Sequence, residues 1–257
     1  MKLFIGSIVG RTEEVGFSQS MRLLWRELDR TGIEFTDGTV VGDALVSRSR
    51  SMVASTFMRS DCDVMLSIDS DIWFRAVDAI KLAEAALEYD MIGALYMTRN
   101  LNTQPALMLP MGEGISFDPD AQPVQTPFVA GGFTAVNRRV FEALSAGLPL
   151  CHQGCSSRSA DTSFWPFYMP FVIPSETEGS IYLSEDWALC ERARDAGFQV
   201  WLDPSIRLGH MGSYMYTLED LIRGDKPAAQ PLKLLRESDG TLSTFQAEAS
   251  ISQGGER

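Results

Sequence analysis

Two aspartates directly follow an apolar segment in the stretch VMLSIDSDIWF, residues 64–74. Asp69 and Asp71 are two positions apart, and side chains at that spacing leave a strand on the same face. A Mg²⁺ or Mn²⁺ ion between the two carboxylates would form an oxygen-ligand site with room for phosphate oxygens. The alternative is an ordinary surface turn, in which aspartates are common. The preceding run VMLSI indicates a buried strand, and this position favours the metal site.

A second acidic pair lies in SEDW, residues 184–187. Ser184 suits the N-cap of a helix, and Glu185 and Asp186 would then face the positive end of that helix favourably. The same place would suit a general base that takes a proton from an incoming hydroxyl group. The sequence supports the structural and the catalytic interpretation equally.

His210 is one of two histidines, and Gly209 and Gly212 beside it leave the backbone free to approach another group. A lone histidine is more often structural than a ligand. An imidazole that joined carboxylate and phosphate oxygens would nevertheless suit Mn²⁺.

Several arginines precede or follow the expected strands. Arg48 and Arg50 lie before the Asp69 strand, and Arg11 follows the first strand, close to Ser7. These residues belong either to a solvated surface or to a site where guanidinium groups bind a diphosphate or a nucleobase.

The cluster Cys151, His152 and Cys155 lacks a clear second ligand pair, which favours ordinary loop residues over a zinc site. The chain contains four cysteines and no secretory signal, so free thiols are expected.

The elements that must position these residues alternate between strand and helix over the first hundred positions. Strands are expected at 2–9, 62–68 and 90–97, a strand–turn–strand at 33–41, and helices at 17–32, 47–60 and 76–89. This alternation predicts an α/β fold with a doubly wound, mostly parallel sheet flanked by helices. Ligands of such sheets bind beyond the carboxyl ends of the strands, where Asp69 and Asp71 lie.

The pattern changes after residue 100. Shorter strands are expected in PALML, GISFD and FVAGGFTAV, which predict a smaller mixed sheet, and helices in RRVFEAL and at 184–197. Residues 149–180 are expected to form a long aromatic loop, whose Phe164, Trp165, Phe167 and Tyr168 either contact a sugar or fill hydrophobic space. We expect one domain over 1–224, with a nucleotide-binding half (about 1–100) and an acceptor half (about 101–224). The polar tail 225–257 is expected to be partly disordered.

The charge balance limits the partners. The formal net charge of −12 disfavours a broad nucleic-acid or anionic-membrane surface. A local groove of Arg48, Arg99, Arg138 and Arg139 would still allow a nucleic-acid acceptor. The apolar run at the N-terminus is too short for a signal peptide or a membrane span, so we expect a cytoplasmic protein without a membrane span.

Taken in order, four segments of the chain resemble glycosyltransferases of the GT-A fold, in particular the small bacterial and bacteriophage enzymes related to the Anp1-like mannosyltransferases. The segments are RSRSMVASTFMRSDCDVMLSIDSDIWF (48–74), MIGALYMTR (91–99), FVAGGFTAVNRRVFEAL (128–144) and SEDWALCERARDAGFQVWLDPSIRLGHMGSY (184–214). The resemblance spans about residues 3–216. It implies transfer of a hexose or pentose from a UDP- or GDP-sugar to an acceptor hydroxyl group, with Mn²⁺ or Mg²⁺ as the cofactor.

The resemblance also implies roles for individual residues. Asp69 and Asp71 correspond to the D-x-D pair, with Asp71 the more direct metal ligand and Asp69 nearer the ribose or donor sugar. His210 corresponds to the histidine that completes the metal site. Asp186, together with Glu185, corresponds to the acidic motif that faces the acceptor. In an inverting transfer Asp186 would take the proton from the acceptor hydroxyl group, whereas in a retaining transfer it would position the substrate.

Three further positions carry implied roles in donor binding. Gly131 and Gly132 correspond to a glycine pair that lets the donor sugar lie against the backbone. Arg50 stands where relatives have an arginine followed by asparagine, whereas Ser51 follows it here. Arg50 and the metal would stabilise the departing diphosphate.

Two other classes of protein stay open. A sugar-phosphate nucleotidyltransferase would need a glycine- and arginine-rich loop after its first strand, and GRTEEVG is too acidic for that. A non-catalytic nucleotide-sugar- or carbohydrate-binding module would not need the full set of acidic residues and His210. The acceptor is a glycan, a protein, a small molecule or a hydroxymethylated phage DNA base.

Overall fold

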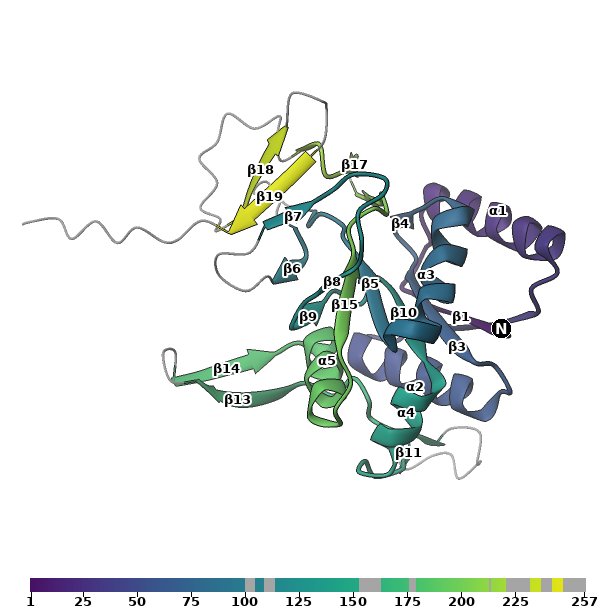
Figure 1. Ribbon diagram of the computed structural model, residues 1–257. Helices are drawn as coiled ribbons and strands as arrows, with labels where there is room; N and C mark the ends of the chain where they lie inside the picture. The colour runs from purple at the N-terminus through teal and green to yellow at the C-terminus, as the bar shows by residue number, and fades with distance from the viewer. Residues whose placement is uncertain are drawn as a thin grey trace, which may run out of the picture.

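The computed structural model describes residues 1–99, 105–108, 114–152, 163–175, 179–212 and 214–220, and the backbone of 232–236 and 242–246. Its centre is a seven-stranded sheet with the order β2-β1-β3-β10-β5-β15-β8 (Figure 1). The strands are β1 (Leu3–Val9), β2 (Phe35–Val41), β3 (Val64–Asp69), β10 (Phe133–Asn137), β5 (Met91–Ala94), β15 (Val200–Asp203) and β8 (Val124–Gln125). Only β10 and β8 run against the other five. The predicted α/β architecture with a mostly parallel sheet is therefore confirmed.

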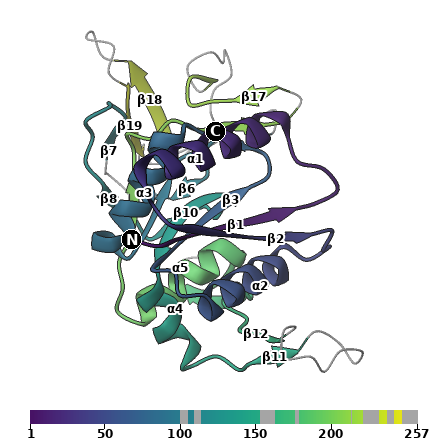
Figure 2. The same cartoon turned by 90° about the vertical axis from the view of Figure 1, so that its right-hand side faces the viewer.

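Helices cover both faces of this sheet. α1 (Val15–Thr31) and α3 (Ala76–Tyr89) pack on one face, and α2 (Val46–Arg59), α4 (Arg138–Ser145) and α5 (Glu185–Asp195) pack on the other. Figure 2 shows α1 and α2 on opposite sides of β1 and β2. Side chains alternate along each strand, so Leu3 and Ile5 enter the core under α1 and α3, whereas Phe4 enters the core under α2.

The boundaries of α1 agree with the sequence pattern. Phe17, Met21, Leu24 and Leu28 recur at helical spacing, and all four are buried against the sheet. Gly32 follows the helix with φ of 70°, a left-handed conformation that glycine adopts without steric cost. The predicted stop at Gly32 is confirmed.

Shorter strands surround the central sheet. They are β4 (Ile72–Trp73), β6 (Leu107–Met108), β7 (Gly114–Ser116), β9 (Phe128–Val129), β11 (Cys151–His152), β12 (Ser163–Phe164), β13 (Phe171–Ser175), β14 (Gly179–Leu183), β16 (Gly209–Met211), β17 (Met215–Tyr216), β18 (Leu232–Arg236) and β19 (Leu242–Gln246). The small sheet β17-β16-β4 is important for the site, because it joins the segment after β3 to the segment after β15.

Three local predictions need correction. Residues 35–41 form the single strand β2 rather than a strand, a turn and a second strand, because Gly38 pairs in register with Gly6. FVAGGFTAV contains two strands, β9 and β10, separated by Ala130–Gly132. The described parts of 149–180 include β11, β12 and β13, so this segment is not one irregular loop.

The C-terminal segment of the chain is described only in part. Strands β18 and β19, within the segment for which disorder is predicted, pair with each other, and β19 also pairs with β7. The other residues from 221 onward lie outside the described part, and the domain boundary near 224 stays a prediction. Among the described residues, no helix combines the length and the apolar character that a membrane crossing requires.

Candidate active site

A cavity of about 380 Å³ opens at the carboxyl ends of β1 and β3, next to the first turns of α2 and α5. This is the edge of the sheet at which the sequence predicts ligand binding. The cavity brings together most of the predicted site residues. Its lining consists of Ile8, Val9, Gly10, Asp43, Val46, Ser49, Arg50, Asp69, Ser70, Asp71, Tyr96, Arg99, Glu185, Asp186 and His210.

Asp71 and His210 meet because β4 and β16 pair. His210 lies opposite Ile72 in this antiparallel ladder, and the Met211 amide donates to the Asp71 carbonyl at 2.7 Å. The ladder places His210 Nε2 3.6 Å from Asp71 Oδ2. Asp71 and His210 therefore lie close together, as predicted.

The imidazole of His210 is oriented by the backbone. His210 Nδ1 lies 2.6 Å from the Met97 carbonyl oxygen, which can only accept a hydrogen bond, so Nδ1 carries the hydrogen. In the neutral ring Nε2 then presents its lone pair towards the Asp71 carboxylate. Asp71 Oδ2 also pairs with Arg99 at 3.0 Å, so Asp71 Oδ1 is the oxygen of this carboxylate that is available to a metal ion beside the imidazole.

Asp69 is held by a buried arginine. Arg50, with a side chain only 5% exposed, donates from one terminal nitrogen to Asp69 Oδ2 at 2.8 Å and from the other to the Gly131 carbonyl at 3.0 Å. Burial opposes the charge of the guanidinium, but the Asp69 carboxylate outweighs this effect and raises the pKa of Arg50. Arg50 is therefore a fixed positive charge beside Asp69.

Glu185 and Asp186, in the first turn of α5, differ in their hydrogen bonds. Asp186 Oδ1 accepts from the Ser184 hydroxyl at 2.5 Å and from the Trp187 amide at 2.8 Å, and Asp186 Oδ2 accepts from the Gly131 amide at 3.3 Å. Glu185 Oε1 lies 3.6 Å from Arg50 Nε. Burial, and then repulsion by Asp186, raise the pKa of the Glu185 carboxyl group.

The glycine pair between β9 and β10 allows these side chains to converge. A Cβ on Gly131 would lie 3.2 Å from both Arg50 Cζ and Asp186 Cβ. A Cβ on Gly132 would lie 2.7 Å from the Tyr96 hydroxyl oxygen and 2.9 Å from Asp69 Oδ2. The absence of side chains here is thus required by the protein's own packing, and the expected contact with a donor sugar stays a prediction.

Three of the four buried side-chain polar atoms that lack a hydrogen-bond partner in the described structure belong to this site. They are Arg50 Nε, Asp69 Oδ1 and Asp71 Oδ1. Native proteins rarely leave such atoms unpaired, because each one costs free energy. Two such carboxylate oxygens and an imidazole that line the same cavity fit a divalent cation that takes its remaining ligands from a bound molecule. No group of three or more histidine, cysteine or acidic residues in the described chain could hold a metal unaided.

Several predicted ligand-binding residues lie elsewhere. The Ser7 hydroxyl faces α1 and lines a different cavity, since its position on β1 points it to the opposite side of the sheet from Ile8. Arg11 is exposed and lines neither cavity. Arg48 forms a two-point ion pair with Asp43, whose pKa this hydrogen bonding lowers to about 2. Their predicted contact with a nucleotide stays untested.

The four arginines that would form a nucleic-acid groove do not share one. Arg48 pairs with Asp43 at the start of α2, whereas Arg138 donates to backbone carbonyls at the end of that helix. Arg139 pairs with Asp90, and Arg99 pairs with Asp71 at 3.0 Å. The predicted groove is wrong, because each arginine is engaged by a different partner at a different place.

Sequence reasoning missed two contributors to the site. Tyr96 accepts a hydrogen bond from the Gly132 amide at 3.1 Å and lies edge-on against the His210 ring. Arg99, which sequence reasoning placed only in the groove, also donates to the Met211 carbonyl at 2.9 Å and so braces the β16 segment against Asp71. Both residues follow β5, and their position just beyond a strand was the available signal.

The aromatic residues of the 149–180 segment mainly fill the core. Phe167 and Tyr168 are 0% and 2% exposed, whereas Phe164 and Trp165 are half-buried. The Tyr168 amide donates to the Ser51 hydroxyl at 3.1 Å, so Ser51 attaches this segment to α2. Hydrophobic filling therefore accounts for Phe167 and Tyr168. Cys155, the third residue of the possible zinc cluster, lies outside the described residues.

No family model matches the sequence, and no curated protein matches it in a sequence comparison. Among solved structures, GalNAc-T7 with UDP, GalNAc and Mn²⁺ is 12% identical with a TM-score of 0.48, over 82% of this chain and 44% of that one. A Drosophila β1,4-galactosyltransferase 7 mutant in complex with manganese, UDP-Gal and xylobiose is 13% identical with a TM-score of 0.39, over 95% and 94% of the two chains.

A third solved structure belongs to a different class of enzyme. The 4-diphosphocytidyl-2C-methyl-D-erythritol synthase from Anaerococcus prevotii is 9% identical with a TM-score of 0.32, over 57% of this chain and 76% of that one. This chain spans less than half of the GalNAc-T7 structure. At these identities and TM-scores, none of the three neighbours transfers a function to this chain.

Proposed function

We propose that the chain is a metal-dependent glycosyltransferase of the GT-A type, which moves a sugar from a nucleoside diphosphate sugar to an acceptor hydroxyl group. One observation carries the proposal: Asp69, Asp71, His210, Arg50 and Glu185 converge on one cavity at the carboxyl ends of parallel strands. In the described part of the chain, buried atoms of Asp69, Asp71 and Arg50 have no hydrogen-bond partner there. A bound ligand would satisfy them.

The charges of the cavity support a divalent cation as the cofactor of a nucleoside diphosphate sugar. A diphosphate adds negative charge to a site that already contains Asp69 and Asp71, so a divalent cation is needed to hold it. Asp71 and His210 would hold Mn²⁺ or Mg²⁺, and Asp69 Oδ1, which has no hydrogen-bond partner in the described chain, is available to the ion or to the donor. The ion, when bound, supplies positive charge to the diphosphate leaving group.

The remaining roles, which are charge stabilisation, positioning and proton transfer, belong to residues of the chain. Arg50 fixes the Asp69 carboxylate and adds positive charge beneath the donor. Asp186 is locked by hydrogen bonds from Ser184, Trp187 and Gly131, which suits a positioning role. Glu185 has the carboxylate with the raised pKa, and in an inverting transfer it takes the proton from the attacking hydroxyl group. The sequence favoured Asp186 for this role, and the hydrogen bonds favour Glu185.

The finer assignments are part of the proposal. The donor is a UDP- or GDP-sugar that carries a hexose or pentose, and the acceptor is a glycan, a protein, a small molecule or a hydroxymethylated phage DNA base. The relation to Anp1-like and bacteriophage enzymes and the cytoplasmic location also stay predictions.

The proposal is tested by incubating the chain with a panel of UDP- and GDP-sugars, with and without Mn²⁺, and measuring released nucleoside diphosphate. We expect slow, Mn²⁺-dependent hydrolysis of at least one donor. Asp71→Ala should lower it at least about 100-fold, the order of loss when one electrostatic contact to a transition state is removed. Asp120→Ala is the matched control, since Asp120 is exposed and lies outside the cavity.

Two results would contradict the proposal. An absence of turnover with every donor would leave a nucleotide-sugar-binding module as the better explanation. Release of pyrophosphate from a sugar phosphate and a nucleoside triphosphate would instead identify a nucleotidyltransferase.

A further inference from the structure

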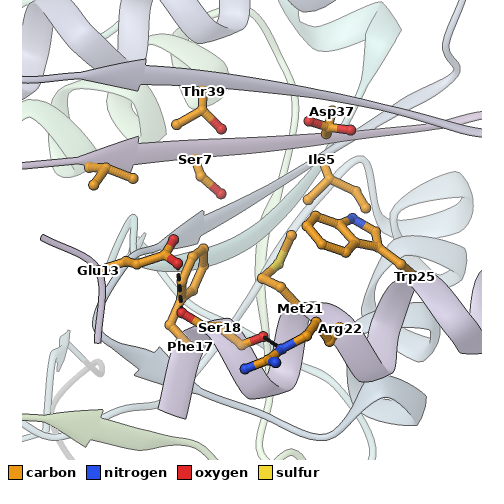
Figure 3. A pocket seen from close by; sticks show the side chains of 11 residues that line it. Ile5, Ser7, Glu13, Phe17, Ser18, Met21, Arg22, Trp25, Asp37 and Thr39 are labelled. Atoms are coloured by element: carbon orange, nitrogen blue, oxygen red, sulfur yellow. Dashed lines mark hydrogen bonds between the residues drawn. The ribbon is translucent and has the colours of Figure 1, made fainter. Parts of the chain in front are cut away.

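A second cavity, of about 400 Å³, lies between α1 and the strands β1 and β2 (Figure 3). It is on the face of the sheet opposite Arg50, and Val9 is the one residue that lines both this cavity and the candidate active site. The second cavity exists because α1 covers β1 but not the edge strand β2. Ile5 on β1 is 1% exposed, whereas Asp37 and Thr39 on β2 are exposed and point towards α1.

The helix side of the cavity combines a buried apolar floor with an exposed tryptophan. Phe17 and Met21 are 4% and 5% exposed, and Trp25, one turn further along α1, is 37% exposed. The other four tryptophans of the chain are all less exposed. An indole left open above an apolar floor offers a flat surface on which a ring can pack.

The strand side of the cavity presents polar groups. The Ser7 hydroxyl faces the cavity from a residue of which only 5% is exposed. A hydroxyl group in a cavity wall can both donate a hydrogen bond to a bound molecule and accept one from it. On β2, Thr39 pairs with Ser7 and Asp37 pairs with Ile5. Two hydroxyl groups therefore line one part of the cavity, and a carboxylate lies next to Trp25 (Figure 3).

The charges of the cavity disfavour negatively charged ligands. Glu13 and Asp37 contribute two negative charges and Arg22 one positive charge. Glu13 also accepts a hydrogen bond from Ser18 at 2.7 Å, and Arg22 donates to the Ser18 carbonyl at 3.2 Å, so both charged groups are held in place. A net negative lining disfavours phosphates and nucleotides but not a neutral molecule.

We propose that this cavity is a binding site for a neutral saccharide. Trp25 packs against the apolar face of a sugar ring, and Ser7, Thr39 and Asp37 bind its hydroxyl groups. A volume of about 400 Å³ is within the range of small-molecule sites and accommodates a disaccharide. This site goes beyond the proposed transferase activity, because it lies on the other face of the sheet and needs neither a metal ion nor a nucleotide.

The test uses the full chain, without metal or nucleotide, titrated with maltose, cellobiose and lactose. Saturation-transfer NMR detects binding and calorimetry measures the affinity. We expect millimolar or tighter binding of at least one disaccharide, and weaker binding of glucose 1-phosphate than of the neutral sugars. Trp25→Ala should weaken binding about tenfold or more, and Trp25→Phe less, because a ring is retained. Asp37→Asn should weaken it several-fold.

Leu23→Ala is the matched control, because Leu23 is 54% exposed on the same helix but does not line the cavity, and it should bind like the unaltered chain. Asp71→Ala should also keep saccharide binding, so failure of the transferase proposal and failure of this one are distinguishable. The proposal is overturned if none of the three disaccharides binds. It is also overturned if Trp25→Ala binds as well as the unaltered chain, or if Asp71→Ala abolishes binding, which would place the sugar in the other cavity.

Discussion

Glu185 and Asp186 are neighbours in the sequence, but their carboxyl groups have different surroundings. Both oxygens of Asp186 accept hydrogen bonds, whereas Glu185 approaches Arg50 at 3.6 Å and has a raised pKa. Pairs of acids whose surroundings differ in this way commonly have separate roles in enzymes. At the scale of the residue, the structure therefore favours Glu185 as base and Asp186 as a positioning group.

The pH dependence of transfer tests this assignment. Glu185 must lose its proton to act as a base, so the rate should rise with pH, with a midpoint above the ordinary 4.5 of a glutamate because the pKa is raised. Glu185→Gln should remove this rise and lower kcat/KM about 10²- to 10⁴-fold. The measurement is kcat/KM from about pH 4 to 8. If Asp186→Asn removes the rise and Glu185→Gln keeps it, the roles are exchanged.

At the scale of the element, α2 depends on a residue from α4. Arg138 donates to the carbonyl oxygens of Phe57 at 3.0 Å, Ser60 at 2.8 Å and Cys62 at 2.6 Å, at and beyond the last turn of α2. The last carbonyls of a helix have no partner within the helix, and a cation there also stabilises the helix dipole. Arg138 therefore holds the helix that carries Arg50.

Replacing Arg138 or its neighbour Arg139 by methionine should distinguish the stabilisation of α2 by Arg138 from the loss of a surface charge. Arg138→Met should lower the free energy of unfolding by about 2–4 kcal/mol, because several charge-assisted hydrogen bonds to buried carbonyls are lost. Arg139→Met should cost less than about 1 kcal/mol, since Arg139 is 55% exposed and pairs with Asp90 at the surface. Urea unfolding measures both. Equal effects of the two substitutions would show that Arg138 does not stabilise α2 in this way.

At the scale of the whole molecule, the sheet separates two cavities with different chemistry. The cavity beyond β1 and β3 contains carboxylates, an imidazole and a buried arginine, which suit a metal ion and a diphosphate. The cavity under α1 has hydroxyl groups, an indole and a net negative charge, which suit a neutral sugar. The alternation of side chains along β1 produces this separation, because Ser7 and Ile8 face opposite sides.

Ligand-linked stability of the whole chain tests the metal site without turnover. UDP or GDP together with Mn²⁺, at about 100 times the dissociation constant, should stabilise the fold by about 2.7 kcal/mol. For a chain of this size, that raises Tm by roughly 5–10 °C. His210→Ala should largely remove the shift, because the imidazole that would help to hold the cation is lost. An equal shift in the presence of EDTA would contradict the metal site.

The sequence alone determined the main helices, most strands of the central sheet, and where reactive side chains leave them. The apolar run before Asp69 and the helical spacing in α1 are local patterns that reflect hydrogen bonding and burial within one segment. For this reason the α/β fold and the acidic residues beyond β3 and at the start of α5 were predictable.

Only the tertiary structure decided which of these residues meet. Asp71 and His210 are distant in the sequence and are joined by the β4–β16 ladder, while Arg50 reaches Asp69 because Gly131 and Gly132 leave space. The same long-range packing placed Ser7 on the α1 side of the sheet and distributed the four arginines among separate partners. Strand register and the choice of sheet face depend on contacts between distant segments, and no local pattern contains them.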